Sequence, residues 1–158
     1  MEVMAIKSIT TADVMLKTGR DLLPKSVIED FLEIRSINYR NILDKTLAEY
    51  TIAEWLVCLK EKVLLESCLP YISQKIDIDP LTPGFFYKGE MLYDVTGIDK
   101  LFWEKHRDWF EYFRIKIKTV LDMIENDPGT IEIRHEYIAA YRKFTEDLYK
   151  DEIAARLP

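Results

Sequence analysis

The sequence predicts an all-α, or mostly α, protein that forms one domain over residues 1–158. Apolar residues recur every three or four positions along most of the chain, which is the period of an amphipathic helix. Thr-x-x-Glu capping boxes occur at two helix starts, and most Pro and Gly residues fall between 70 and 97. We therefore expect an antiparallel helical bundle of four main helices and a short N-terminal one, with an aromatic hairpin or loop inserted at about 77–97.

The N-terminal region predicts two helices. Thr11–Thr18 is expected to form a short helix that Gly19 ends in the left-handed conformation. Pro24 suits the first turn of a longer helix, because its fixed φ matches helical backbone, and apolar spacing carries this helix to about Leu43.

The next predicted helix begins at Thr46 or Thr51, each of which heads a capping box. It runs to about Leu69 and stops before Pro70, because a residue that precedes proline is biased away from helical backbone. Its apolar band is wide, which indicates a helix that contacts neighbours on more than one side.

Cys58 and Cys68 both fall on this predicted helix. At about 1.5 Å rise per residue, ten residues place their Cα atoms roughly 15 Å apart. A disulfide needs less than about 7 Å. We therefore expect free, buried thiols, which is typical of a reducing cytoplasm.

The segment from Pro70 to Gly97 is the one stretch without a helical pattern. Phe85–Tyr87 and Met91–Val95 flank a Lys-Gly-Glu turn, which predicts a small β-hairpin or an ordered aromatic loop. Because an isolated hairpin is marginally stable in water, its aromatic face is expected to pack on the helices.

Two helices are predicted after this insertion. The first spans about Asp99–Glu125, and its seam steps by four, four, three and four through Trp109, Phe113, Ile117, Val120 and Ile124. Residues 114–118 also alternate at period two, which leaves a strand open there. Asp127-Pro128 is a helix start signal for a last helix that reaches Tyr149 or beyond.

Charge and hydropathy exclude several classes of partner. The net charge is −6, which disfavours nucleic acid. No apolar run approaches the roughly 20 residues of a membrane helix, and the N-terminus lacks the features of a signal peptide, so we expect a cytoplasmic protein without membrane contact.

Five carboxylates and one lysine give residues 77–99 a charge of −4, and residues 122–136 carry the same balance. A local acidic field of this kind can steer a basic partner.

Signals for catalysis are few. The chain has no phosphate-binding glycine loop and no Gly-x-Ser-x-Gly elbow. His106 shares a helical face with Trp103 and Trp109, where an imidazole can act as a general base. Glu132 and His135 have the Glu-x-x-His spacing of di-iron bundles, but a second copy of the motif is missing. We expect no catalytic residue, no metal and no cofactor.

These observations favour a non-catalytic module that binds another protein. Tyr and Trp are the usual anchors of protein interfaces, and carboxylates complement a basic partner. At the level of class, a small acidic cytoplasmic protein of this kind resembles an immunity protein or antitoxin that masks a toxin. The predicted contact residues are Asp77, Asp79, Tyr87, Glu90, Tyr93, Asp94 and Trp103. A small helical enzyme or ligand-binding bundle that uses His106 or Glu132/His135, and a self-associating structural subunit, remain as alternatives. The oligomeric state is not predicted.

Overall fold

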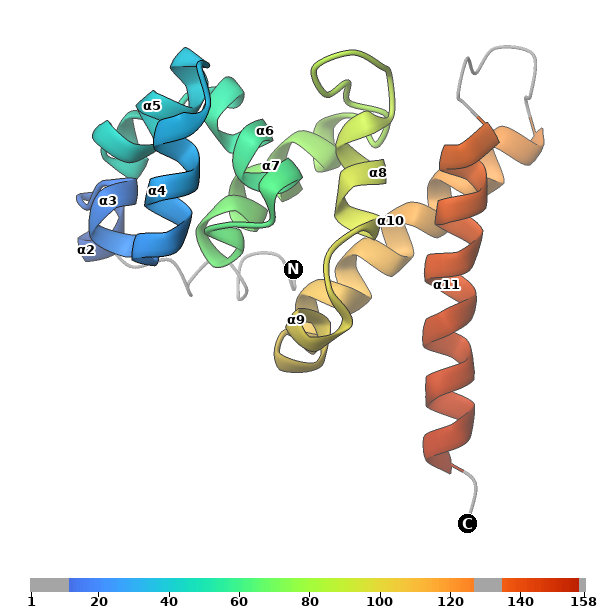
Figure 1. The fold of residues 1–158 in the computed structure, drawn as a ribbon. Coiled ribbons are helices and arrows are strands. Elements are labelled where there is room, and N and C mark those ends of the chain that lie inside the picture. The colour runs from blue at the N-terminus through green and yellow to red at the C-terminus, as the bar shows by residue number, and fades with distance from the viewer. Residues whose placement is uncertain (1–11, 127–134, 157–158) are drawn as a thin grey trace. The chain divides into compact units, whose positions relative to one another are not determined.

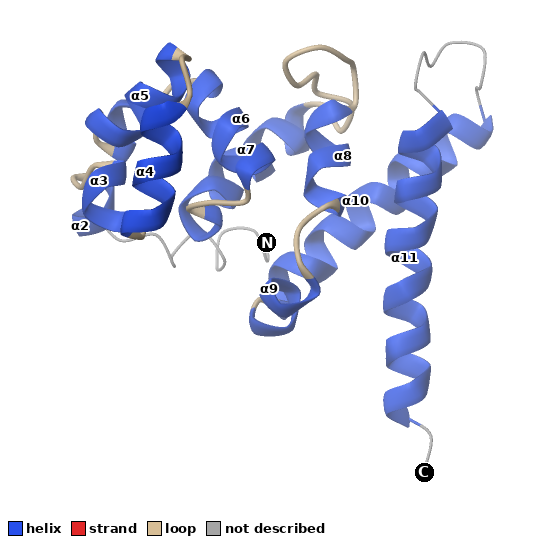
Figure 2. Ribbon diagram, in the orientation of Figure 1, coloured by secondary structure: helices blue, strands red, loops and turns tan. Residues whose placement is uncertain are grey.

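A computed structural model describes residues 12–126 and 135–156, with side chains described as far as residue 146. The regular elements in these ranges are helices (Figure 2). One isolated β-bridge joins Thr18 to Thr46. The predicted all-α class is therefore confirmed. The chain divides into two compact units, residues 1–74 and 75–158. Whether the two fold as the single domain expected for 1–158 stays a prediction.

Unit 1 is a set of short helices, drawn from blue to green in Figure 1. Its elements are α2 (Ala12–Met15), α3 (Gly19–Leu22), α4 (Lys25–Glu33), α5 (Ile37–Asp44), the 3-10 helix η1 (Leu47–Glu49), α6 (Ile52–Glu61) and the first part of α7 (Leu65–Ile78). Helix α5 lies in the middle and packs against α3, α4 and α6. The buried side chains at its centre include Phe31, Ile42, Leu43, Leu47, Trp55 and Leu59.

The predicted role of Gly19 is wrong. Gly19 does not end a helix in the left-handed conformation; it is the first residue of α3. Thr18 caps this helix, since its side chain accepts from the Asp21 backbone N–H and the Asp21 carboxylate accepts from the Thr18 N–H at 3.0 Å. Thr18-x-x-Asp21 is thus a third capping signal in the sequence, and it begins a helix where the glycine suggested an end.

The single helix predicted from Pro24 to about Leu43 is also wrong, because two helices occupy this range. Pro24 does begin the first of them, as its N-cap residue. The chain leaves helical backbone at Ile34 and re-enters it after Ser36, the N-cap residue of α5. Neither Gly nor Pro marks this break, so the apolar period continues through it and the sequence pattern conceals it.

Both predicted capping boxes are confirmed, although they begin different elements: Thr46 begins η1 and Thr51 begins α6. The predicted stop before Pro70 is wrong. The break comes earlier, where Lys62 and Leu64 take left-handed φ values of 58° and 52°, and α7 then runs through Pro70. Burial of the α7 side chains Leu69, Ile72 and Ile76 outweighs the hydrogen bond that proline cannot donate.

Because of this break, Cys58 lies on α6 and Cys68 on α7, so the helical-rise argument for their separation does not apply. Both are free and buried. Burial raises the pKa of the Cys58 thiol to about 12 and raises that of Cys68 well above its usual value. A buried thiol with a raised pKa carries little of the nucleophilic thiolate.

We expect both thiols to react with iodoacetamide at least about a hundredfold more slowly in the native protein than in urea, because thiolate fraction and access both fall on folding. Mass spectrometry of timed, quenched samples would resolve the two sites. Comparable rates in native buffer and in urea would contradict the burial described for Cys58 and Cys68.

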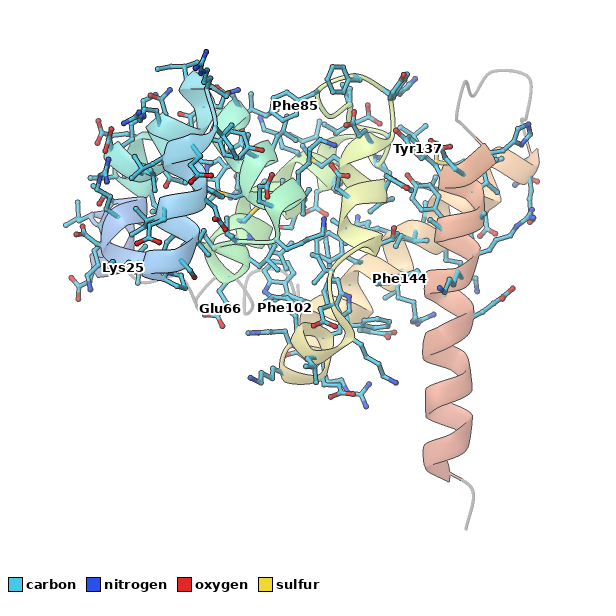
Figure 3. The ribbon with its side chains drawn as sticks, in the orientation of Figure 1. Lys25, Glu66, Phe85, Phe102, Tyr137 and Phe144 are labelled. Carbon is cyan, nitrogen blue, oxygen red and sulfur yellow. The ribbon has the colours of Figure 1, made fainter. Side chains whose placement is uncertain are left out.

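Unit 2 contains the last turn of α7, then α8 (Glu90–Thr96), α9 (Lys100–Lys105), α10 (Arg107–Asn126) and α11 (His135–Arg156). Helix α11 packs against α8 and α10, and Figure 3 shows Tyr137 and Phe144 on the side of α11 that faces them. Of the five residues in the predicted seam of α10, Ile124 is half-buried and the other four are buried: Trp109, Phe113, Ile117 and Val120. The start signal Asp127-Pro128 lies outside the described residues.

In unit 2, two of the open alternatives do not form and one predicted helix is divided. Met91–Val95 is not a strand of a hairpin but the body of α8, which follows Gly89 in the left-handed conformation. The helix predicted over Asp99–Glu125 is divided at His106, whose φ of −130° and ψ of 59° end α9 before α10 begins. Residues 114–118 are helical, so the strand left open there does not form.

Candidate binding surface

Among the described side chains of unit 2, the most exposed Phe, Tyr and Trp lie on the connection between α7 and α8. We call residues 79–89 the aromatic loop. Phe86 is 78% exposed, Tyr87 47% and Phe85 37%. The loop stands above α8, and Figure 3 labels Phe85 on it. Ile78, the residue just before the loop, is also exposed. Four large apolar side chains thus meet solvent within ten residues, whereas singly scattered ones are ordinary.

The backbone of the aromatic loop is held by hydrogen bonds at its base and at its tip. At the base, the Gly89 N–H donates to the Leu81 carbonyl at 3.0 Å. The Tyr141 hydroxyl of α11 donates to the Gly89 carbonyl at 2.8 Å. At the tip, the Gly84 N–H donates to the Tyr87 carbonyl at 3.2 Å. The loop is therefore an ordered part of unit 2. Of the two forms predicted for the insertion, a hairpin and an ordered aromatic loop, it matches the second.

Two of the predicted contact carboxylates, Asp77 and Asp79, are exposed near the base of the aromatic loop. Asp77 pairs with Lys116 at 3.1 Å and accepts a hydrogen bond from the Tyr112 hydroxyl. Burial, and then this hydrogen bond, raise the pKa of Tyr112. Asp79 accepts from the Leu81 N–H at 2.9 Å, which shapes the start of the loop. Both carboxylates keep an exposed side toward solvent.

The structure buries three of the other predicted contact residues. Glu90 is 3% exposed, and its carboxylate accepts from the backbone N–H groups of Phe86 and Tyr87. Asp94 is buried on α8, and Trp103 is buried among aromatic rings of α9, α10 and α11. The contact role predicted for these three residues stays a prediction, and the surface described by exposure does not include them.

Tyr93 and Tyr87, the two predicted tyrosine anchors, differ in placement. Tyr93 is half-buried on α8, and its ring stacks on Tyr137 of α11 with centroids 4.2 Å apart. Tyr87 lies at the tip of the aromatic loop beside Phe86, with centroids 6.3 Å apart. Of the predicted set, Asp77, Asp79 and Tyr87 are exposed, on the last turn of α7 and on the aromatic loop that follows it.

The structure describes two of the three residues of the enzymatic alternative, His106 and His135. His106 lies at the junction of α9 and α10, where its ring stacks on Phe102 with centroids 4.2 Å apart. His135 is exposed at the start of α11, and Glu132 lies outside the described residues. Among the residues that the structure describes, no three His, Cys, Asp or Glu side chains are grouped to hold a metal ion.

Phe85 and Phe86 are exposed on the aromatic loop but are absent from the predicted contact residues. Three aromatic residues in succession after Pro83-Gly84 are the signal that was present in the sequence. The sequence places them on the aromatic face of a hairpin or ordered loop, and this face is expected to pack on the helices because an isolated hairpin is marginally stable in water. Only the fold shows that this short connection turns them outward.

Comparison with known proteins does not assign a function. No protein-family model, curated protein or solved structure matches the chain. In the described ranges, no helix has both the length and the apolar character that a membrane crossing requires. Any functional conclusion must therefore come from the surface itself.

Proposed function

We propose that this chain is a non-catalytic protein-binding module that anchors a partner protein through the aromatic loop. The observation that carries the proposal is the exposure of Phe85, Phe86 and Tyr87 on a loop whose backbone is fixed by hydrogen bonds. Exposed aromatic side chains on an ordered support bind with little loss of conformational entropy, and aromatic anchors dominate the energetics of protein interfaces.

The partner that we propose is a basic protein. Asp77, on the last turn of α7, and Asp79, the first residue of the aromatic loop, are exposed, and the chain carries a net charge of −6. Complementary charge accelerates association and disfavours wrong partners. Because Glu90 and Asp94 are buried, the carboxylates contribute less of this surface than the sequence suggests, and the aromatic residues contribute more. The functional class that we propose is an inhibitor of the immunity or antitoxin type, which masks the partner's active site.

We expect Phe86→Ala combined with Tyr87→Ala to lower partner affinity by at least about 2 kcal/mol, the cost that defines an interface hot spot. The measurement starts with affinity capture from the native host on three baits: the wild type, this double variant and Leu101→Ala. Leu101 is the matched control, because it is an exposed apolar residue of α9 outside the aromatic loop. Proteins that the wild type and Leu101→Ala retain and the double variant loses are then purified and titrated by calorimetry.

The proposal requires one stoichiometric complex with a basic protein, whose affinity falls with added salt and whose own activity is blocked at one equivalent. A partner that binds the Phe86→Ala/Tyr87→Ala variant as tightly as the wild type would remove the aromatic loop from the interface. A complex in which the partner keeps its activity would refute the inhibitor class, although the protein-binding role would still hold.

A further inference from the structure

We infer that Glu90 is a positioning residue of the aromatic loop: it holds the loop tip in its binding shape from inside without touching the partner. This inference rests on the proposed function, because it concerns how the same surface is kept ready. It assigns Glu90 a different role from the contact role that its charge suggests in the sequence.

The geometry begins with one buried carboxylate oxygen. Oε2 of Glu90 accepts the Phe86 N–H at 2.8 Å and the Tyr87 N–H at 3.0 Å. The side chain is 3% exposed, although it belongs to the first residue of α8. A buried carboxylate is costly unless hydrogen bonds satisfy it, and bonds to a charged acceptor are stronger than neutral ones. The two bonds therefore fix the peptide groups that carry the exposed rings.

Gly84 completes this arrangement, because it leaves room for the Glu90 side chain. A Cβ atom at position 84 would lie 2.8 Å from Cδ, 2.9 Å from Cγ and 3.0 Å from Cβ of Glu90. Real Cβ atoms do not approach other heavy atoms so closely, so any side chain at this position must displace Glu90. Gly84 also donates to the Tyr87 carbonyl at 3.2 Å, which closes the loop tip from the other side.

The functional consequence is preorganisation. Phe86 and Tyr87 bind a partner more tightly when their backbone is already ordered, because the entropic cost of ordering it does not then reduce the affinity. If Glu90 were released, the tip would have to be ordered at the moment of binding, and affinity would fall without the loss of any contact with the partner. Substitution of Glu90 and substitution of Gly84 should therefore lower partner affinity in the same way, although glycine carries no charge.

The first test needs no partner. We compare amide hydrogen exchange at Phe86 and Tyr87 in the full chain for the wild type, Glu90→Gln and Gly84→Ala, well below the unfolding transition. Exchange at both amides should accelerate by roughly tenfold or more, because hydrogen bonds to a charged acceptor are lost or weakened. Gly97→Ala is the control, since Gly97 is exposed with an ordinary φ of −84°. Unchanged exchange in both variants would overturn the positioning role.

The second test uses the partner protein isolated with the wild-type bait. Glu90→Gln and Gly84→Ala should each weaken binding by about tenfold under conditions in which far-UV circular dichroism shows both variants folded. A merely structural role would lower the unfolding temperature and leave this affinity unchanged. Wild-type affinity in both variants, alongside loss of binding in Phe86→Ala/Tyr87→Ala, would overturn the inference and leave the proposed function intact. Wild-type affinity in Phe86→Ala/Tyr87→Ala would instead refute the proposed surface.

Discussion

Gly19→Ala is expected to destabilise unit 1 by about 3 kcal/mol, the upper range for overpacking a filled site. A Cβ atom on Gly19 would lie 2.1 Å from the carbonyl oxygen of Ile42 and 3.2 Å from the Tyr50 hydroxyl. That hydroxyl donates to the same Ile42 carbonyl. The new methyl group would therefore push on the Ile42 backbone, which cannot swing away as a side-chain end can, and would disturb a buried hydrogen bond.

Urea unfolding followed by circular dichroism would measure this loss, and amide exchange would assign it to α3 and α5. Gly97→Ala serves again as the control, and its effect should stay within about 0.5 kcal/mol because the site is an exposed helix end with ordinary backbone. If Gly19→Ala lowered the free energy of unfolding by less than about 1 kcal/mol, α3 would be able to move away from α5 at little energetic cost.

Gly19 also illustrates why parts of the fold could be predicted and others could not. Local chemistry predicts helix starts, and the capping boxes at Thr46 and Thr51 are found where the sequence places them. Gly19 has two possible meanings in sequence, a left-handed helix end and a close backbone approach. Only the position of α5 decides between them, and that position is a long-range property.

The helix breaks show the same limit. The seam of α10 is predictable because its period depends on one helix only. The breaks at Ile34–Ser36, at Lys62–Leu64 and at His106 contain no Gly or Pro. Their backbone is set by how the flanking helices pack, and tertiary packing readily overrides local propensity. Pro70 makes the opposite point, because a residue that usually ends a helix lies within α7.

For the candidate surface, residue type alone could locate the region but not the individual contacts. The sequence marks 77–97 as unlike the rest of the chain, but residues 77–78 belong to α7 and residues 90–96 form α8. It does not show that Glu90 turns inward and Phe86 outward, because both placements depend on two backbone hydrogen bonds made by one carboxylate. Charge in a sequence indicates exposure only when no internal donor is available to satisfy it.

Glu54 is a second carboxylate that turns inward, and its removal is expected to be among the most damaging changes in unit 1. The residue is 1% exposed on α6. It pairs with Lys45 at 3.0 Å and accepts the Thr51 hydroxyl at 2.8 Å. Breaking a buried ion pair from one side costs about 3–5 kcal/mol. Because Lys45 keeps about a third of its side chain in water, we expect Glu54→Ala to cost about 3 kcal/mol, at the lower end of that range.

The pH dependence of stability gives Glu54 a signature that a packing defect would not have. Burial opposes ionisation, but the hydrogen bonds from Thr51 and Lys45 outweigh it and lower the pKa of Glu54 below 4.5. Since the folded pKa lies below the unfolded one, the unfolded state binds the proton more tightly. The stabilisation by the carboxylate is therefore complete above about pH 4.5 and is lost as the pH falls through the folded pKa.

Urea unfolding of the wild type and Glu54→Gln at a series of pH values from 7 to 3 would test this dependence. The difference in unfolding free energy between them should shrink as the pH falls, because a protonated glutamic acid resembles glutamine. Glu49→Gln is the matched control, since Glu49 occupies the same position of the Thr46 capping box but is exposed. Its effect at pH 7 should be smaller than that of Glu54→Gln, because solvent can replace the hydrogen bonds of an exposed carboxylate and cannot reach a buried one. A pH-independent difference between the wild type and Glu54→Gln would show that Glu54 contributes packing rather than charge.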